Sequence, residues 1–475
     1  MDRTPHVLIF PFPAQGHITQ MLKLAELLCL SGIQVTFLNT HHNHRRLRRH
    51  ADIDSRFPAS LRFQTIPDGL PPHHPRRQFG FLKEWIYSVD IKSQIEPSFR
   101  HLLVSYQSQN NPVTCIISDG VLTFTIDVGM GLGIPTISFR TVSTCCLWTY
   151  FWLPQLVRSG DLKFGGEELI DMDERVSSIP GSETFLRRRD LPSFYRSKEI
   201  DKTGMEFVDT ETQNSTKSHA LILNTFEDLE SPILSEIRNR FTKIYTIGPL
   251  HTLLNTKRAE PISVSSNGLW EVDRTCMKWL DSQTPKSVIY VSFGSVVLMK
   301  HSEMMEIWHG LVNSEKPFLW VVRPDSITEE LESSDEVAEE VAEETKKRGC
   351  IVGWAPQEEV LAHGAVGGFL GHGGWNSTLE SVVAGVPLIC WPHFADQTVN
   401  SRFVEEVWRV GLDMKDRCDR STVEMMVRDL MDEKGEGLRE STARMGELAR
   451  ESVRDGGSSF CNFKDLMEDL RLMCQ

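Results

Sequence analysis

The chain has 475 residues, of which 40% are hydrophobic and 24% are charged, a composition typical of globular proteins. Its formal net charge of −14 argues against a nucleic-acid-binding surface. The ten cysteines lack the short spacings of a zinc site or a disulfide framework, which favours buried thiols in a reducing compartment. We therefore expect a cytosolic protein of two or three domains.

The N-terminal stretch predicts neither a signal peptide nor a membrane anchor. It has one early arginine and a short apolar run that ends in proline and glycine, without the longer apolar segment of a secretory signal. Since no stretch of about 18 apolar residues occurs in the chain, we expect no insertion into a membrane.

The first 250 residues predict a doubly wound α/β domain. Residues 6–12 form a buried-strand run, residues 18–30 carry apolar side chains at helical spacing, and residues 34–39 form a second strand. Later strand runs alternate with helical patterns, at residues 61–66, 113–118, 134–139, 220–224 and 245–249. This alternation is the pattern of a parallel sheet covered by helices on both faces.

Two polar side chains of this domain follow the ends of predicted strands. His17 lies in the turn after the first strand, and Asp119 follows the strand at residues 113–118. Ligands of such sheets bind outside the carboxyl ends of the strands. A histidine backed by a carboxylate can act as a general base, because the carboxylate fixes the tautomer and stabilises the imidazolium.

Two other runs of this domain have competing interpretations. The basic run at residues 41–50 is interpreted as a solvated helix or loop; its histidines could bind a metal, but the four arginines beside them would repel a cation. The aromatic run at residues 139–152 fits plain core packing, but we favour a wall of an apolar pocket.

The second half of the chain predicts another βαβ array. We expect a linker at residues 251–275, a second domain at residues 276–457, and an amphipathic helix at residues 458–475 that packs back on the first domain. A strand at residues 288–292 precedes Ser295, and the acidic run at residues 325–348 suggests a solvated helix and loop.

The stretch at residues 354–397 is the most specific signal in the chain. A buried strand ends in a glycine-rich turn, and a helix then begins at Trp375 with free N–H groups that suit phosphate. His372, Asn376 and Ser377 crowd hydrogen-bonding groups at this turn, and Glu380 lies on the same helical face as Asn376, where a carboxylate could accept two ribose hydroxyls.

This stretch resembles, without a gap, the signature box of plant family 1 UDP-glycosyltransferases. It departs from the family's usual pattern at Gly373, where Cys is more common. The resemblance covers nearly the whole chain and implies an α/β fold of the GT-B class: two Rossmann-like doubly wound domains facing across a cleft. The first domain (residues 1–250) would bind the acceptor, and the second would bind the UDP-sugar.

The resemblance also implies roles for individual residues. Trp354 would stack on uracil and Glu380 would hold the ribose; the diphosphate would be held by Ser295, His372, Asn376 and Ser377. The sugar would be contacted by Trp375, Asp396 and Gln397, and the set of UDP-sugar contacts would be completed by Ala355 and Gln357. His17 would be the catalytic base, oriented by Asp119.

These roles describe an inverting hexosyltransferase that acts by direct displacement. The resemblance implies no cofactor and no metal, with UDP-glucose as co-substrate because Gln397 closes the box as in members that prefer glucose. An NAD-type Rossmann enzyme is disfavoured, since GxGxxG is missing and Asn39 stands where an acidic residue is needed.

The acceptor is expected to be a small apolar plant metabolite. The aromatic run most resembles members that act on terpenoid or iridoid-type alcohols; a phenolic or flavonoid acceptor, a carboxyl group as the attacked position, and a non-catalytic nucleotide-sugar-binding protein remain as alternatives. We expect an acceptor pocket that includes Ser143, Trp148 and Phe394, a sugar contact from Thr141 or Ser143, and a monomeric enzyme.

Overall fold

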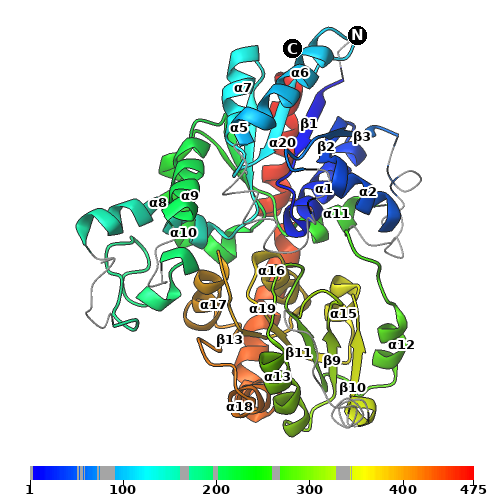
Figure 1. Cartoon of the computed structure of the whole chain (residues 1–475), viewed down its shortest axis with the longest axis vertical. Coiled ribbons are helices and arrows are strands. Elements are labelled where there is room, and N and C mark those ends of the chain that lie inside the picture. Colours follow the sequence, from blue (N-terminus) through cyan, green and yellow to red (C-terminus); the bar gives the residue numbers. More distant parts are fainter. Residues whose placement is uncertain are drawn as a thin grey trace. The chain divides into compact units, whose positions relative to one another are not determined.

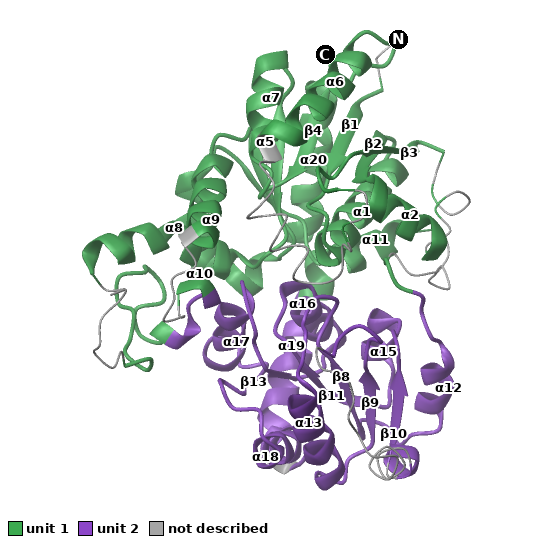
Figure 2. Cartoon of the chain, viewed as in Figure 1, with its two compact units in different colours: residues 1–188, 194–270, 449–475 green, residues 189–193, 271–448 purple. Residues whose placement is uncertain are grey.

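The chain folds into two compact units. The computed structural model describes residues 4–50, 53, 57, 59–71, 74, 91–160, 171–195, 202–258, 268–327, 343 and 345–474. Unit 1 comprises residues 1–188, 194–270 and 449–475, and unit 2 comprises residues 189–193 and 271–448 (Figures 1 and 2).

Unit 1 is built on a seven-stranded parallel sheet of order β3-β2-β1-β4-β5-β6-β7. The strands are β1 (His6–Phe10), β2 (Gln34–Thr40), β3 (Leu61–Ile66), β4 (Cys115–Asp119), β5 (Thr136–Arg140), β6 (Ala220–Leu223) and β7 (Ile244–Thr246). The strand order reverses between β1 and β4, which is the switch point where ligands of doubly wound sheets bind.

Helices cover both faces of this sheet because its strands are apolar on both faces. On β1, Val7 and Ile9 join a core cluster with α1, α11 and α20, whereas Leu8 and Phe10 join a cluster with α6 and α7 (Figure 1). The helices of unit 1 are α1 (Gln15–Leu30), α2 (His41–His50), α5 (Ile91–Gln94), α6 (Glu96–Gln107), α7 (Phe124–Leu132), α8 (Thr144–Ser159), α9 (Lys202–Ser215), α10 (Glu227–Ile237), α11 (Leu250–Lys257) and α20 (Ser458–Leu472).

Unit 2 has a six-stranded parallel sheet of order β10-β9-β8-β11-β12-β13, with its switch point between β8 and β11. Its strands are β8 (Val288–Ser292), β9 (Phe318–Val321), β10 (Gly349–Val352), β11 (Val366–Gly371), β12 (Leu388–Cys390) and β13 (Gly411–Asp413). Its helices are α12 (Thr275–Asp281), α13 (His301–Asn313), α15 (Gln357–Ala362), α16 (Trp375–Ala384), α17 (Gln397–Glu406), α18 (Arg420–Met431) and α19 (Glu436–Ser452), the last of which continues into unit 1.

The structure differs from the sequence expectations mainly at element boundaries. The expected linker at residues 251–275 contains most of α11, whose Leu250, Leu253 and Leu254 are buried in the core of unit 1. The helices α18 and α19 are separate because the backbone becomes extended at Asp432. Most of the acidic run at residues 325–348 lies outside the described residues.

Two expectations concern the surface of the chain. The basic run at residues 41–50 forms α2, in which Asn43 and Leu47 are buried. Three of its arginines are exposed, whereas Arg46 is half-buried and donates to the carbonyl of Leu269 (3.0 Å). Within the described ranges, no helix combines the length and the apolar character that a membrane crossing needs.

Candidate active site

The switch point of the unit 1 sheet brings His17 and Asp119 together. His17 lies in the first turn of α1, directly after β1, and Asp119 is the last residue of β4, which pairs with β1. The Nδ1 atom of His17 lies 2.6 Å from Oδ2 of Asp119. The topology therefore joins two residues that are distant in sequence into one hydrogen-bonded pair.

Asp119 is fixed by main-chain donors. Its side chain is 1% exposed, and its two oxygens accept hydrogen bonds from the N–H groups of Phe12 (3.3 Å) and Val121 (3.2 Å). Together with the contact to His17, these hydrogen bonds hold the carboxylate in one orientation.

The free edge of the His17 ring is its Nε2 atom. Nδ1 contacts both Asp119 and Thr141 Oγ1, the latter at 3.0 Å, so the ring hydrogen is held at Nδ1 by the carboxylate. The His17 side chain is 25% exposed, and its ring packs 5.1 Å from that of Phe12. The Nε2 lone pair can therefore accept a proton from a bound hydroxyl.

The two unit 1 residues expected in the acceptor pocket are engaged in the packing of α8. Ser143 is fully buried at the N-cap of α8, where its hydroxyl accepts from the N–H of Cys146. Trp148 is 4% exposed, and its indole N–H donates to the carbonyl of Pro180 (2.9 Å). The third expected residue, Phe394, belongs to unit 2 and is half-buried.

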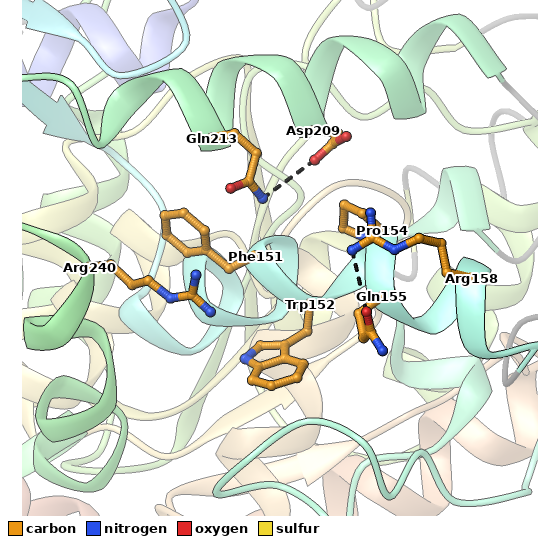
Figure 3. Close-up of a pocket in the computed structure, with 8 residues that line it drawn as sticks. All are labelled: Phe151, Trp152, Pro154, Gln155, Arg158, Asp209, Gln213 and Arg240. Carbon is orange, nitrogen blue, oxygen red and sulfur yellow. Dashed lines mark hydrogen bonds between the residues drawn. The ribbon is translucent and has the colours of Figure 1, made fainter.

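The second half of α8 lines a cavity of about 420 Å³ (Figure 3). Phe151 and Trp152 provide its aromatic wall, and the guanidinium of Arg240 lies 5.6 Å from the Phe151 ring. The remaining lining residues are polar or small: Pro154, Gln155, Arg158, Asp209 and Gln213. The aromatic run thus contributes to a cavity wall, but neither Ser143 nor Trp148 lines this cavity.

In unit 2, the glycine-rich turn between β11 and α16 forms around His372. A Cβ atom on Gly374 would lie 2.4 Å from His372 Nε2, and one on Gly294 would lie 2.7 Å from the same ring. Gly373 has φ +74°, a left-handed conformation that suits glycine and would strain most other residues. The missing side chains leave room for the imidazole between the ends of β8 and β11.

His372 is neutral at physiological pH. Burial lowers the pKa of its imidazole to about 3, with smaller contributions from the nearby His393 and the cation Arg323. A neutral imidazole still carries one N–H donor. Together with the positive end of the α16 dipole, it can bind an anion without taking up a proton.

Gln357 links two residues of the predicted nucleotide site. Its amide nitrogen donates to Ser377 Oγ (3.0 Å) and to Glu380 Oε2 (2.7 Å), while its oxygen accepts from the Tyr290 hydroxyl (3.3 Å). Because Ser377 and Glu380 lie about one turn apart on α16 and are largely buried, this amide holds both in fixed rotamers.

Asp396 and Gln397 are held where α17 begins. Asp396 Oδ2 accepts from the N–H of Trp375 (3.3 Å) and from Asn400 Nδ2 (2.8 Å). The Gln397 oxygen accepts from the N–H groups of His393 (2.9 Å) and Phe394 (3.1 Å). The oxygen of Gln397 is therefore occupied, and its amide N–H₂ group is the part that can contact a sugar.

The other expected donor contacts lie at the ends of β8 and β10. Trp354 is half-buried after β10, and its carbonyl accepts from the N–H of Asp273 (2.8 Å); Ala355 beside it is buried. Ser295 is half-buried after β8. The buried Arg323 donates to the carbonyls of Ser295 and of Val297 (2.6 Å), which fixes this loop.

The sequence analysis assigned no role to three buried polar residues, Arg140, Glu230 and Arg323, or to the half-buried His393. Glu230 of α10 caps α8, because its carboxylate accepts from the Thr144 N–H (3.1 Å) and hydroxyl (2.7 Å) and from the Cys145 N–H (2.9 Å). One feature of the sequence could have indicated Arg140 and Arg323: each is a charged residue at the end of an apolar strand run.

Among the described residues, no cluster of three or more His, Cys, Asp or Glu side chains is arranged to hold a metal ion.

Comparisons with known proteins agree with this geometry. The family model described as UDP-glucoronosyl and UDP-glucosyl transferase matches residues 16–436. A 7-deoxyloganetic acid glucosyltransferase of Catharanthus roseus is 48% identical over 98% of this chain and 97% of its own length. A myricetin 3-O-rhamnoside 1,2-glucosyltransferase of Crocosmia x crocosmiiflora is 44% identical over 98% and 96%.

A solved structure supports the fold. Os79 from O. sativa, crystallised in complex with UDP, superposes with a TM-score of 0.82 at 28% identity and covers 98% of this chain and 100% of its own. The chain therefore belongs to the UDP-glucoronosyl and UDP-glucosyl transferase family, as a plant UDP-glucosyltransferase of the GT-B fold class.

Proposed function

We propose that this enzyme moves glucose from UDP-glucose to a hydroxyl of a small apolar plant metabolite, by direct displacement with inversion. The observation that carries the proposal is the His17–Asp119 pair, in which Nδ1 is bound to a buried carboxylate and Nε2 is left for the acceptor. A terpenoid or iridoid-type alcohol is the favoured acceptor.

The proposed reaction is a single substitution at the anomeric carbon. His17 Nε2 takes the proton of the acceptor hydroxyl while the acceptor oxygen bonds to C1 of glucose. The bond between C1 and the β-phosphate oxygen breaks, and UDP leaves with the electron pair. Asp119 stabilises the imidazolium that forms, and the proton then passes to solvent.

In this proposal, unit 2 holds the donor and stabilises the leaving group. Trp354 stacks on uracil, Glu380 accepts the ribose hydroxyls, and Gln357 keeps Glu380 in place. The negative charge that develops on UDP meets the α16 N-terminus, with His372, Asn376, Ser377 and Ser295 around it. These donors are pre-organised by neighbouring hydrogen bonds, so no metal ion is required by the proposal.

Glucose is the proposed sugar because of the groups at the start of α17. The Gln397 amide N–H₂ can donate to a ring hydroxyl, and the Asp396 carboxylate can accept from one. Since Gln397 is 3% exposed, a sugar epimer that left this amide unpaired would lose about 1–3 kcal/mol of binding.

The names of the relatives support the choice of acceptor. The iridoid-type 7-deoxyloganetic acid is the substrate in the printed name of one relative, which keeps both a hydroxyl and a carboxyl open as the attacked group. The myricetin glycoside in the name of another supports a phenolic acceptor as the second candidate. We further propose a monomer in the cytosol, where the ten free cysteines of the chain would stay reduced.

The test is a transfer assay on the purified protein. UDP-glucose is incubated with a panel of iridoid and terpenoid alcohols, iridoid acids and flavonoids, and the products are detected by mass spectrometry. We expect a gain of one hexose on an iridoid or terpenoid member of the panel. Gain only on flavonoids would select the second candidate, and binding of UDP-glucose without any transfer would select a non-catalytic binding protein.

A further inference from the structure

A buried arginine stands beside the dyad without a carboxylate partner. Arg140 is the last residue of β5, the strand that pairs with β4, and it is 3% exposed. One terminal nitrogen donates to the carbonyl of Gly120 (3.0 Å), and the other donates to the Thr212 hydroxyl of α9 (2.8 Å). Its Nε atom is buried and makes no hydrogen bond within the described structure.

The side chain runs directly over the residue that follows Asp119. A Cβ atom on Gly120 would lie 2.3 Å from Arg140 Cδ, so the glycine is needed for this path. None of the ion pairs formed by the described residues, within 4.0 Å, includes Arg140. A buried charge without a directly bonded counter-ion is destabilising, so packing alone is a poor reason for it.

Asp119 is also a buried charged group beside Arg140. It is a buried carboxylate whose hydrogen bonds come from two main-chain N–H groups and from the His17 ring. Asp119 and Arg140 end neighbouring strands, and in this arrangement the charge of Asp119 acts on Arg140 through the protein interior. Each charge thus has the other as a long-range counter-ion.

We propose that Arg140 is a positioning residue for the transfer reaction: its buried charge offsets that of Asp119, so that the dyad binds one proton rather than two before the acceptor arrives. This inference rests on the proposed function of His17 as the base. If Arg140 were neutral, Asp119 would be a lone buried anion, and the imidazole beside it would bind a second proton more readily.

Other charged or titratable groups around Arg140 come from each element packed against it. Tyr150 and Cys146 belong to α8 and Glu211 belongs to α9. His17 of α1 contacts Asp119, which acts on Arg140. Burial lowers the pKa of Arg140, while Asp119, Tyr150 and Glu211 raise it; a guanidinium keeps its charge across the working pH range. Glu211 Oε2 also accepts from the N–H of Thr123 (2.7 Å).

The competing role for Arg140 is purely structural: its hydrogen bonds would link β5, the turn at Gly120 and α9, and its charge would not matter.

Four variants separate the two roles. Arg140→Gln removes the charge, and Arg140→Lys keeps it. Thr212→Val removes a hydrogen bond without a change of charge, and Glu211→Gln removes an anion while keeping an acceptor for Thr123. Two readouts are measured on each from pH 5 to 9: kcat/KM with UDP-glucose and an alcohol acceptor, and the NMR titration of the His17 ring, assigned by its loss in His17→Ala.

In Arg140→Gln, we expect the acidic limb of the pH profile of kcat/KM to move up by about one pH unit, and the midpoint of the His17 NMR titration to move with it. On that limb, a shift of one unit lowers the activity about tenfold. Arg140→Lys should stay near wild type in both readouts. Thr212→Val should lower the thermal midpoint without moving the limb, and Glu211→Gln should move the limb slightly to lower pH.

A uniform loss of activity at every pH in Arg140→Gln, or an unmoved His17 titration, would overturn the electrostatic role. Should Arg140→Gln not fold, Glu211→Gln decides, because an unmoved or upward limb in that variant contradicts the proposal. The NMR readout needs no turnover, so a wild-type protein that transfers no glucose would refute the proposed function without deciding the outcome for Arg140.

Discussion

His17 Nδ1 lies 2.6 Å from Asp119 Oδ2 although the two residues are 102 positions apart in the chain. The contact exists because β1 and β4 are neighbours at the switch point of the unit 1 sheet, so that the turn after β1 meets the end of β4. Asp119 is buried and His17 is partly exposed, which directs the basic Nε2 atom away from the carboxylate.

Loss of either partner should lower turnover with little effect on donor binding. We expect His17→Ala to lower kcat by about 10²–10⁴, the usual contribution of a positioned base. Asp119→Asn should give a related loss, because an amide in this place favours the tautomer with hydrogen on Nε2. Steady-state kinetics with an alcohol acceptor, beside UDP calorimetry, provide the measurement.

Asp127→Asn is the matched control, since Asp127 is an exposed carboxylate on α7. It should behave as wild type. Near-normal turnover in His17→Ala, on an acceptor that must be deprotonated, would remove His17 from the role of base.

Glu380 and Gln397 should divide the recognition of nucleotide and sugar. Glu380→Ala should weaken UDP and UDP-glucose binding alike, and Gln357→Ala should do so more mildly, because Gln357 holds both Glu380 and Ser377. Calorimetry with UDP and with UDP-glucose tests this; a variant that loses affinity only for UDP-glucose would contradict it.

Gln397→His should instead reduce the selectivity for UDP-glucose over UDP-galactose. Loss of the amide N–H₂ should lower the UDP-glucose to UDP-galactose ratio of kcat/KM by roughly ten- to a hundredfold, while UDP affinity stays the same. The account of Gln397 fails if UDP affinity changes and the ratio does not.

Activity should survive EDTA. In the proposed function, the α16 N-terminus and the neutral His372 supply hydrogen-bond donors for the diphosphate, which is the role that a cation would otherwise have. Rates with and without EDTA, and after Mg²⁺ or Mn²⁺ is added back, provide the comparison. Complete loss in EDTA that either ion restores would refute this prediction.

Two half-buried histidines, His372 and His393, should make the stability of unit 2 fall in mild acid. Burial lowers the pKa of His372 to about 3 and that of His393 to about 4. An unfolded histidine titrates near 6.5, so below that pH the unfolded chain binds more protons than the folded one. This part of the stability is present above about pH 6.5 and is lost as the pH falls toward 4, on the order of 1–2 kcal/mol per imidazole by pH 5.

Urea unfolding of the protein at a series of pH values measures this slope. His393→Phe should make the slope shallower, because the phenyl ring keeps the contact with Trp391 and has no proton to gain. His41→Gln, at an exposed position on α2, should leave the slope as in wild type. Equal slopes in all three proteins would show that His393 is not titrating as described.

The sequence predicted local features well and distant partnerships only in part. The turn at His372 and the helix that follows it are encoded within a few residues, by glycines and by the small polar side chains at the helix start. The meeting of His17 and Asp119 required the order of the strands, which the βαβ pattern and the family resemblance suggested.

Contacts that depend on packing between distant elements could not be predicted. Arg140 looked like an ordinary strand end, and nothing near it in sequence indicates Gly120 or Thr212 as its partners. For Ser143 and Trp148, which stay predicted acceptor contacts, the sequence did not indicate the hydrogen bonds that they make to the Cys146 N–H and to a carbonyl 32 residues away. The helix α11 lacks a clear apolar period, so only its packing against α1 reveals it.

The anomeric configuration of the first glucoside tests the central claim most directly. UDP-glucose carries its sugar as the α-anomer, so a single displacement assisted by His17 must give a β-glucoside. The measurement is the proton NMR spectrum of the product, taken early in the reaction of wild-type enzyme with an iridoid or terpenoid alcohol. A β-linked product is the predicted result, and an α-linked product would contradict inversion by direct displacement.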